Sequence, residues 1–396
     1  MKKYIYVLTC FAFSLPSFFL GSEPLDASVN LFASHFYQES LAGSNKNELF
    51  SPYCLFNCLS MAYIGSDGPT EMEIRKALCL EISQEDLPKS INDLAYRLLP
   101  HNRSFQLNIA NSVWIDRNAF LLSSYQQILQ KDFLADVESL DFRKSAQTAD
   151  LINQWVSQKT CNTIQKLLGP QDISRDTQLM LVSALYFKDD WAKPFKLAKT
   201  HQDLFYTTPH KSKTIPMMSQ IGEFSYYENS EMQLVLLPFS GKNATNEGMA
   251  CFFILPKTTL KEIEDRLHEL PINEWISSSE KMQIKVEIPR FEMRLNYDLI
   301  PALNKLGIHE AFSTRANFSK INGRFDLSIN KAIQEAFFSL NEKGVTASAA
   351  TAIGIGMTCV REEPSAIPFT ANHPFLFGIV DLKSNVMLFL GKMIEP

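Results

Sequence analysis

The sequence predicts an α+β fold, and three features point to it. Residues 179–187 form a nearly unbroken apolar run typical of a central strand, and residues 281–290 alternate like a strand with one buried face. Residues 27–41 and 150–168 carry apolar side chains at helical spacing. Predicted strands and helices follow each other without the regular period of a doubly wound sheet, which favours α+β over α/β.

The elements follow from local patterns in chain order. Residues 48–52 predict a short strand that runs into a helix, with Ser51 as the cap, Pro52 in the first turn and an end near Ile64. Further strands are expected over 107–115, 137–142, 179–187, 232–239, 250–255, 281–290, 375–381 and 386–390, and further helices over 121–133, 150–168 and 257–267. For residues 327–340, the spacing of Ile333, Phe337 and Leu340 predicts a helix.

The stretch GVTASAATAIGIGM, Gly344–Met357, is unlike the rest of the chain. Its residues after the glycine carry no charge and no proline, and most are small. They alternate between an apolar set that starts at Val345 and a small or weakly polar set that starts at Thr346. This pattern predicts a strand that lies in a sheet or is held out of one. A flexible small-residue linker or an Ala-rich helix start is the alternative.

The first residues have the features of a secretory signal. Lys2 and Lys3 precede an apolar run over 4–15, so we expect a signal peptide over 1–22, with an uncertain cleavage site, and export to an extracellular or periplasmic space. An uncleaved anchor is the alternative, although Pro16 makes a stable membrane span less favourable. The remainder, 23–396, shows no linker that would divide it.

The composition excludes several classes of function. A net charge of −5 with mixed signs argues against nucleic-acid binding. The seven cysteines are scattered without a CxxC pair, so no disulfide framework is inferred, and the seven histidines are dispersed. The chain has no GxSxG, HExxH, P-loop or GxGxxG motif. We therefore expect no enzyme, no metal and no cofactor.

Several segments together resemble the serpin family of protease inhibitors, in colinear order over about residues 25–396. The residues that carry the resemblance are Phe50-Ser-Pro52, Asn153-Gln-Trp-Val156 with Thr160, Leu181–Lys188 with Trp191 (family pattern LVNALYFKGxW), Ile288–Phe291, Asn341-Glu-Lys-Gly344, His373–Phe377 and Phe389–Lys392. Each motif alone is weak, whereas the ordered set is specific.

The resemblance implies a single domain with three β-sheets, about nine helices and a reactive loop over about 344–366. It also implies that 327–340 is a long strand, against the helix that its spacing predicts. In this family a protease attacks the exposed loop and forms an acyl-enzyme. The cleaved loop then inserts into the main sheet as a new strand and carries the protease with it.

The resemblance also assigns roles to residues. The usual distance from the hinge glycine places the reactive bond at Thr358–Cys359, with Met357 and Arg361 as alternative recognition residues. Arg361 would suit trypsin-like proteases and Met357 elastase-like or chymotrypsin-like ones, while papain-like cysteine proteases are a further option. The hinge and the inserting positions are Glu342, Gly344, Val345, Ala347, Ala349 and Thr351. The region where the sheet opens contains Ser51, Cys54, Ser183, Trp191 and Gln334.

Three departures from the family pattern bear on these roles. Val345 stands where threonine is commonest, but it is neither large nor charged, so insertion should survive. Ser183 replaces the usual asparagine and Cys54 a common serine, which either loosens a buried hydrogen-bond cluster or is a repacking without consequence. Cys359 is either an ordinary thiol or a redox-sensitive one.

The function expected is a secreted, monomeric suicide inhibitor of a serine endopeptidase, with a cysteine endopeptidase as the alternative target. A non-inhibitory serpin, a carrier or chaperone, is the second hypothesis. The small, uncharged hinge argues against it, because non-inhibitory relatives usually have bulky, charged or proline residues there. No basic stripe indicates activation by a polyanion.

Overall fold

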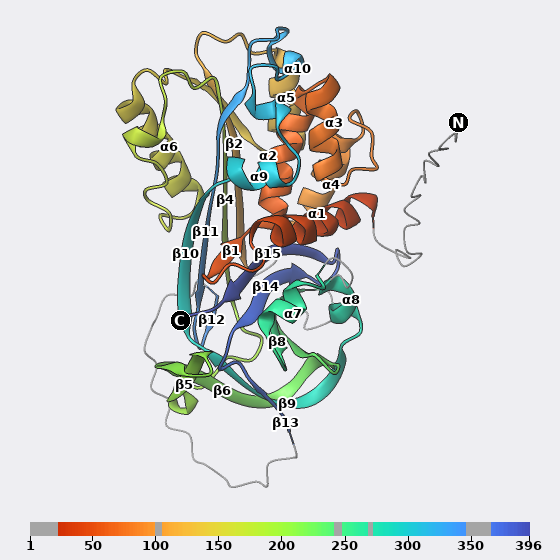
Figure 1. The fold of residues 1–396 in the computed structure, drawn as a ribbon, viewed down its shortest axis with the longest axis vertical. Coiled ribbons are helices and arrows are strands. Elements are labelled where there is room, and N and C mark those ends of the chain that lie inside the picture. Colours follow the sequence, from red (N-terminus) through yellow and green to blue (C-terminus); the bar gives the residue numbers. More distant parts are fainter. Residues whose placement is uncertain (1–22, 100–104, 241–247, 268–271, 346–365) are drawn as a thin grey trace, which may run out of the picture.

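The computed structural model describes residues 23–99, 105–240, 248–267, 272–345 and 366–396 (Figure 1). In these ranges the α-helices are α1 (Pro24–Ser40), α2 (Pro52–Gly65), α3 (Gly68–Ala77), α4 (Leu87–Leu98), α5 (Ser123–Asp132), α6 (Ser145–Lys159), α7 (Leu260–Glu264), α8 (Ile272–Ser277), α9 (Ile300–Lys305) and α10 (Ser319–Asn322). The strands are β1 (Glu48–Phe50), β2 (Gln106–Asp116), β3 (Asp136–Leu140), β4 (Leu179–Asp190), β5 (His201–Thr208), β6 (Lys211–Glu228), β7 (Met232–Pro238), β8 (Met249–Pro256), β9 (Glu280–Pro289), β10 (Phe291–Asp298), β11 (Ile329–Leu340), β12 (Gly344–Val345), β13 (Ile367–Thr370), β14 (Phe375–Asp381) and β15 (Val386–Met393).

The strands form a six-stranded and a nine-stranded sheet. The six-stranded sheet has the order β10-β11-β12-β4-β2-β3 and follows the long axis of the molecule in Figure 1. The nine-stranded sheet has the order β1-β15-β14-β8-β7-β6-β9-β13, with β5 paired to β6. In this sheet the long β6 pairs with β9 along much of its length and with β7 only at its end, so β6 joins the strands β1-β15-β14-β8-β7 to the strands β9 and β13. The α+β prediction is confirmed, and the sheets are roughly consistent with the three that the resemblance implies.

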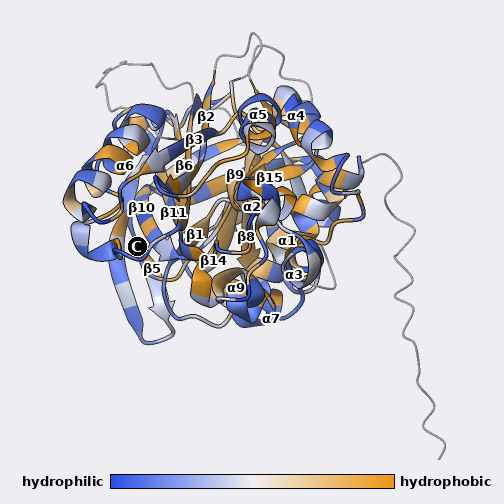
Figure 2. Cartoon of the chain, turned by 90° about the horizontal axis from the view of Figure 1, so that it is seen from above, coloured by the Kyte–Doolittle hydropathy of each residue, from blue (hydrophilic) through white to orange (hydrophobic). Residues whose placement is uncertain are grey.

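The six-stranded sheet is covered on both faces. On one face a small cluster packs residues such as Ala110, Trp114 and Val182 against Ile152 and Val156 of α6. On the other face α2 lies against β2 and β4, within a larger core that extends from Leu25 to Met393. Figure 2 shows hydrophobic residues concentrated between the layers and hydrophilic ones on the outer helices. Among the described residues, no helix is long and apolar enough to span a membrane.

The helix predicted over 327–340 from spacing alone is wrong, because these residues form β11. Ile333 packs against the α6 cluster while Ala332 and Ala336 pack in the main core, so both faces of the strand are buried. A strand buried on both sides loses its polar–apolar alternation, and its apolar positions can then imitate a helix. The strand that the resemblance implies is the correct one.

Two helix predictions need shorter or shifted bounds. The helix expected over 150–168 begins at Ser145 and ends at Lys159. Leu151 is exposed, although it is one of the apolar residues whose helical spacing predicted this helix. The segment that follows it, residues 160–168, lies over the sheet without being helical. The helix expected over 257–267 is limited to α7, Leu260–Glu264.

Candidate functional site at the start of the predicted reactive loop

The six-stranded sheet divides at one end to accept the hinge. β11 and β4 pair directly as parallel strands from Ile329 opposite Leu179 to Ala336 opposite Leu185. Beyond this point β12 lies between them, with Val345 opposite Leu340 on one side and Asp189 on the other. The first two residues of the predicted loop therefore occupy a strand position between β11 and β4.

Gly344 is required by this close approach. A Cβ on residue 344 would lie 2.0 Å from the carbonyl oxygen of Asp189 and 2.7 Å from the Cα of Asp190. These are backbone atoms of β4, so they cannot move away as a flexible side chain could. Glycine alone lets the chain enter the sheet here.

Trp191 holds the turn that leads into β12. Its backbone nitrogen donates to the carbonyl of Lys343 at 2.6 Å, and its indole Nε1 donates to the carbonyl of Asn341 at 2.9 Å. The ring stacks on Phe239 with centroids 4.9 Å apart and planes within 7°. The stacked pair of Trp191 and Phe239 therefore fixes the position at which the chain leaves β11 and turns back into β12.

Glu342, predicted as a hinge residue, is buried in the same turn. Its Oε1 accepts from the hydroxyl of Thr200 at 2.8 Å and lies 3.6 Å from the guanidinium of Arg290. Its backbone carbonyl accepts from the nitrogen of Phe195 at 2.9 Å. The turn is therefore tied to the segment after β4 and to the end of β9 as well as to its own strand.

Four of the five residues predicted for the sheet-opening region meet beneath β4 and β11. The side chain of Gln334 accepts from the nitrogen of Ser51 at 2.9 Å and donates to its carbonyl at 3.1 Å, and its Nε2 lies 3.5 Å from Ser183 Oγ. Ser51 caps α2 by accepting from the nitrogen of Cys54 at 3.2 Å. All four are buried, and they join α2 to the two strands that would have to separate. The fifth, Trp191, lies with the hinge instead.

Cys54 has no features of a reactive thiol. Burial raises the pKa of its thiol to about 12, and the side chain has no exposed surface. It therefore stays protonated near neutral pH and acts as a small packing residue under the sheet.

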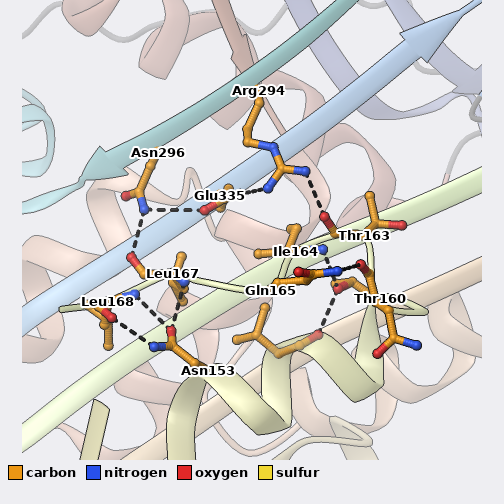
Figure 3. Close-up of polar contacts among 12 residues, drawn as sticks. Asn153, Thr160, Thr163, Ile164, Gln165, Leu167, Leu168, Arg294, Asn296 and Glu335 are labelled. Carbon is orange, nitrogen blue, oxygen red and sulfur yellow. Dashed lines mark hydrogen bonds and ion pairs between the residues drawn. The ribbon is translucent and has the colours of Figure 1, made fainter. Parts of the chain in front are cut away.

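A second set of contacts spans the outer face of the same sheet (Figure 3). We call residues 160–168, which follow α6, the connector. Asn153 of α6 binds its far end through the nitrogens of Leu167 and Leu168, at 2.8 and 2.9 Å. From β10, Arg294 Nη2 donates to the carbonyl of Thr163 at 2.7 Å and Asn296 Nδ2 donates to that of Leu167 at 3.0 Å.

The connector consequently links the two halves of the sheet. The indole nitrogen of Trp155 anchors α6 to Asp136 of β3 at 2.7 Å, on the far side of β4. Arg294 and Asn296 belong to β10, on the far side of β11. Any separation of β4 from β11 must therefore lengthen or break contacts of α6 or of the connector.

Asp189 is a residue of the hinge that the sequence argument did not single out. Asp189 is 5% exposed, its Oδ1 accepts from Ser240 Oγ at 3.0 Å and from the nitrogen of Asp190 at 2.8 Å, and its Oδ2 has no partner among the described residues. Burial raises the pKa of Asp189 to about 6. The sequence did contain a signal for this residue, because Asp189 stands where the family pattern LVNALYFKGxW has glycine.

The other predicted loop residues lie outside the described residues. They are Ala347, Ala349, Thr351, Met357, Thr358, Cys359 and Arg361. Their assignments as inserting positions, reactive bond and recognition residues remain predictions, as does the signal peptide over 1–22.

Comparison with known proteins identifies the family to which this chain is similar. The family model described as serpin (serine protease inhibitor) matches residues 27–396. Intracellular coagulation inhibitor 2 of Tachypleus tridentatus is 33% identical over 94% of this chain and 91% of its own length. Serpin48 of the insect Tenebrio molitor, described as highly specific, superposes with a TM-score of 0.84 at 27% identity, over 95% of this chain and 99% of that structure.

The same fold is also found in a protein named for ligand binding. Human thyroxine-binding globulin superposes with a TM-score of 0.84 at 22% identity, over 94% of this chain and all of that structure. At this identity the likeness establishes the fold alone. Taken with the family match over almost the whole length, these findings show that the chain belongs to the serpin family.

Proposed function

We propose that the protein is an exported inhibitor of an endopeptidase that acts as a suicide substrate. Members of its family are mostly protease inhibitors and generally not enzymes themselves. The observation that carries the proposal is the position of β12, since Gly344 and Val345 already lie between β11 and β4 where an inserting loop would begin. The residues that follow are small and uncharged, so their insertion would desolvate no charge.

The chemistry proposed needs no catalytic group from this chain. The nucleophile of the protease attacks the carbonyl of the reactive bond, which we place at Thr358–Cys359, and the amine of Cys359 leaves as the acyl-enzyme forms. The freed strand then extends β12 between β4 and β11 and gains a ladder of backbone hydrogen bonds on both sides. Movement of the attached protease away from its original position halts deacylation.

The experiment is a denaturing gel of the purified protein with trypsin, elastase, chymotrypsin and papain, with mass spectrometry of the released peptide. A band at the summed mass would support covalent trapping, and the N-terminus of the peptide would identify the bond among Met357, Thr358 and Arg361. Stable trapping of papain alone would assign a cysteine protease as the target. Clean cleavage by every protease of the panel without such a band would favour a non-inhibitory role, as a carrier or chaperone.

A further inference from the structure

The carboxyl of Asp189 lies beside the hinge in a position where its charge is poorly accommodated. Asp189 and Val345 are directly opposed across the β4–β12 pairing, so their side chains are neighbours on one face of the sheet. Val345 is 1% exposed and belongs to the main core. Within the part of the chain that the structure describes, one oxygen of this buried carboxylate, Oδ2, is thus left without a partner next to an apolar side chain.

The groups around Asp189 do not neutralise it. On β4, the neighbouring charge is that of Asp190, which has the same sign and disfavours ionisation further. From the segment after β7, the neutral hydroxyl of Ser240 donates one hydrogen bond, and from β12 the neighbour is Val345. Among the described residues, no cation acts on this carboxyl, and burial outweighs the two hydrogen bonds that favour its charge.

We propose that Asp189 is a positioning residue that couples proton uptake to the seating of the hinge. In its neutral form it stabilises Gly344 and Val345 between β4 and β11, and in its ionised form it favours their departure from the sheet. The family pattern LVNALYFKGxW has glycine at this position, so the carboxyl is a departure of this chain from that pattern.

The sign and size follow from linkage. While the hinge is seated, the pKa of Asp189 is raised to about 6, and departure of Val345 would let water reach the carboxyl and return its pKa toward 3.8, the ordinary value of an aspartate. The seated form is therefore favoured most strongly below pH 4, and the ratio of seated to departed hinge decreases as pH rises from 4 to 6. Two pKa units correspond to a change of about 100-fold in the ratio of seated to departed hinge.

Trp191 provides a local reporter, because its indole donates to the turn before β12. The test is ¹⁹F NMR of the full chain labelled with 5-fluorotryptophan, titrated from pH 4.5 to 8, with the Trp191 resonance assigned by Trp191→Phe. We expect that resonance to change with a midpoint near pH 6 and to stay constant in Asp189→Asn. The control Asp190→Asn should keep the transition with its midpoint moved somewhat to lower pH, because it removes a charge that disfavours ionisation of Asp189. A flat wild-type titration, or an unchanged transition in Asp189→Asn, would overturn the proposal.

A second variant keeps the test decisive if Asp189→Asn does not fold. Ser240→Ala removes a hydrogen bond that favours the ionised form, so the midpoint should move to higher pH. A midpoint that stays the same or moves down would contradict the proposal. The experiment contains no protease, so its outcome is independent of whether the chain inhibits one.

Discussion

Replacing Arg294 with alanine should destabilise the protein and loosen the connector. Arg294 Nη2 donates to the carbonyl of Thr163 at 2.7 Å, and Nη1 lies 3.4 Å from Oε1 of Glu335. The Glu335 side chain is only 3% exposed, whereas that of Arg294 is 45% exposed. The variant therefore removes one connector contact and leaves a buried carboxylate without its cation.

The size of the loss follows from these contacts. A hydrogen bond to a charged group contributes about 1.5–3 kcal/mol, and the exposure of Arg294 favours the lower part of that range. We expect a loss of about 2 kcal/mol in the free energy of unfolding near pH 7. For a chain of this length the unfolding entropy makes this roughly 2–3 °C in Tm. Differential scanning calorimetry measures the shift, and Lys211→Ala, which removes an ion pair with Glu395 that is exposed on both sides, is the control and should leave Tm unchanged.

The pH dependence separates this explanation from a simple loss of packing. Burial raises the pKa of Glu335 and the charge of Arg294 opposes that rise, so the pKa should rise further in the variant. Ionising Glu335 then costs more, and the stability loss should be largest above that pKa and shrink as pH falls toward 5. Adding Glu335→Gln should recover most of the loss at pH 7. An equal loss at pH 5 and pH 8, or no recovery in the double variant, would refute the reasoning.

Three further substitutions test the hinge and the region beneath it. Gln334→Leu should cost about 1–3 kcal/mol in denaturant unfolding, because the buried nitrogen of Ser51 loses its partner while its carbonyl keeps only the bond from the nitrogen of Leu55, whereas the exposed Gln283→Leu should be neutral. Gly344→Ala should unseat β12, since its Cβ would meet the carbonyl of Asp189; faster amide exchange over 344–345 measures this, and Gly248→Ala, with open space around it, should show no effect. Ala349→Glu should convert the proposed inhibitor into a substrate, while Ala350→Glu, on the other face by alternation, should inhibit normally. Unchanged stoichiometry of inhibition in Ala349→Glu would rule out insertion.

The sequence predicts those parts of the fold in which one local signal dominates. The apolar run of β4 and the Ser51–Pro52 start of α2 have the expected form, because burial and capping act over a few residues. The spacing of apolar residues could not identify β11 as a strand, because both of its faces are covered by elements distant in sequence. The resemblance supplied that strand.

For the candidate site, motifs located the residues but not their partners. They placed Ser51, Ser183 and Gln334 in one region, whereas the separate position of Trp191 against Phe239 depends on long-range pairing. The link between Arg294 and the connector joins segments more than a hundred residues apart, with no local pattern to reveal it. In the sequence, Asp189 differs from the glycine of the pattern LVNALYFKGxW, and nothing else indicates it. Its burial depends on the pairing of β12 with β4.

The most direct measurement is the melting temperature of the protein before and after cleavage within residues 346–365. Insertion of the cleaved loop would add on the order of ten backbone hydrogen bonds at about 1 kcal/mol each, so we expect Tm to rise by on the order of 10 °C or more. Unchanged or lower Tm in the cleaved protein would mean that the loop does not enter the sheet between β4 and β11, and would contradict the proposed mechanism.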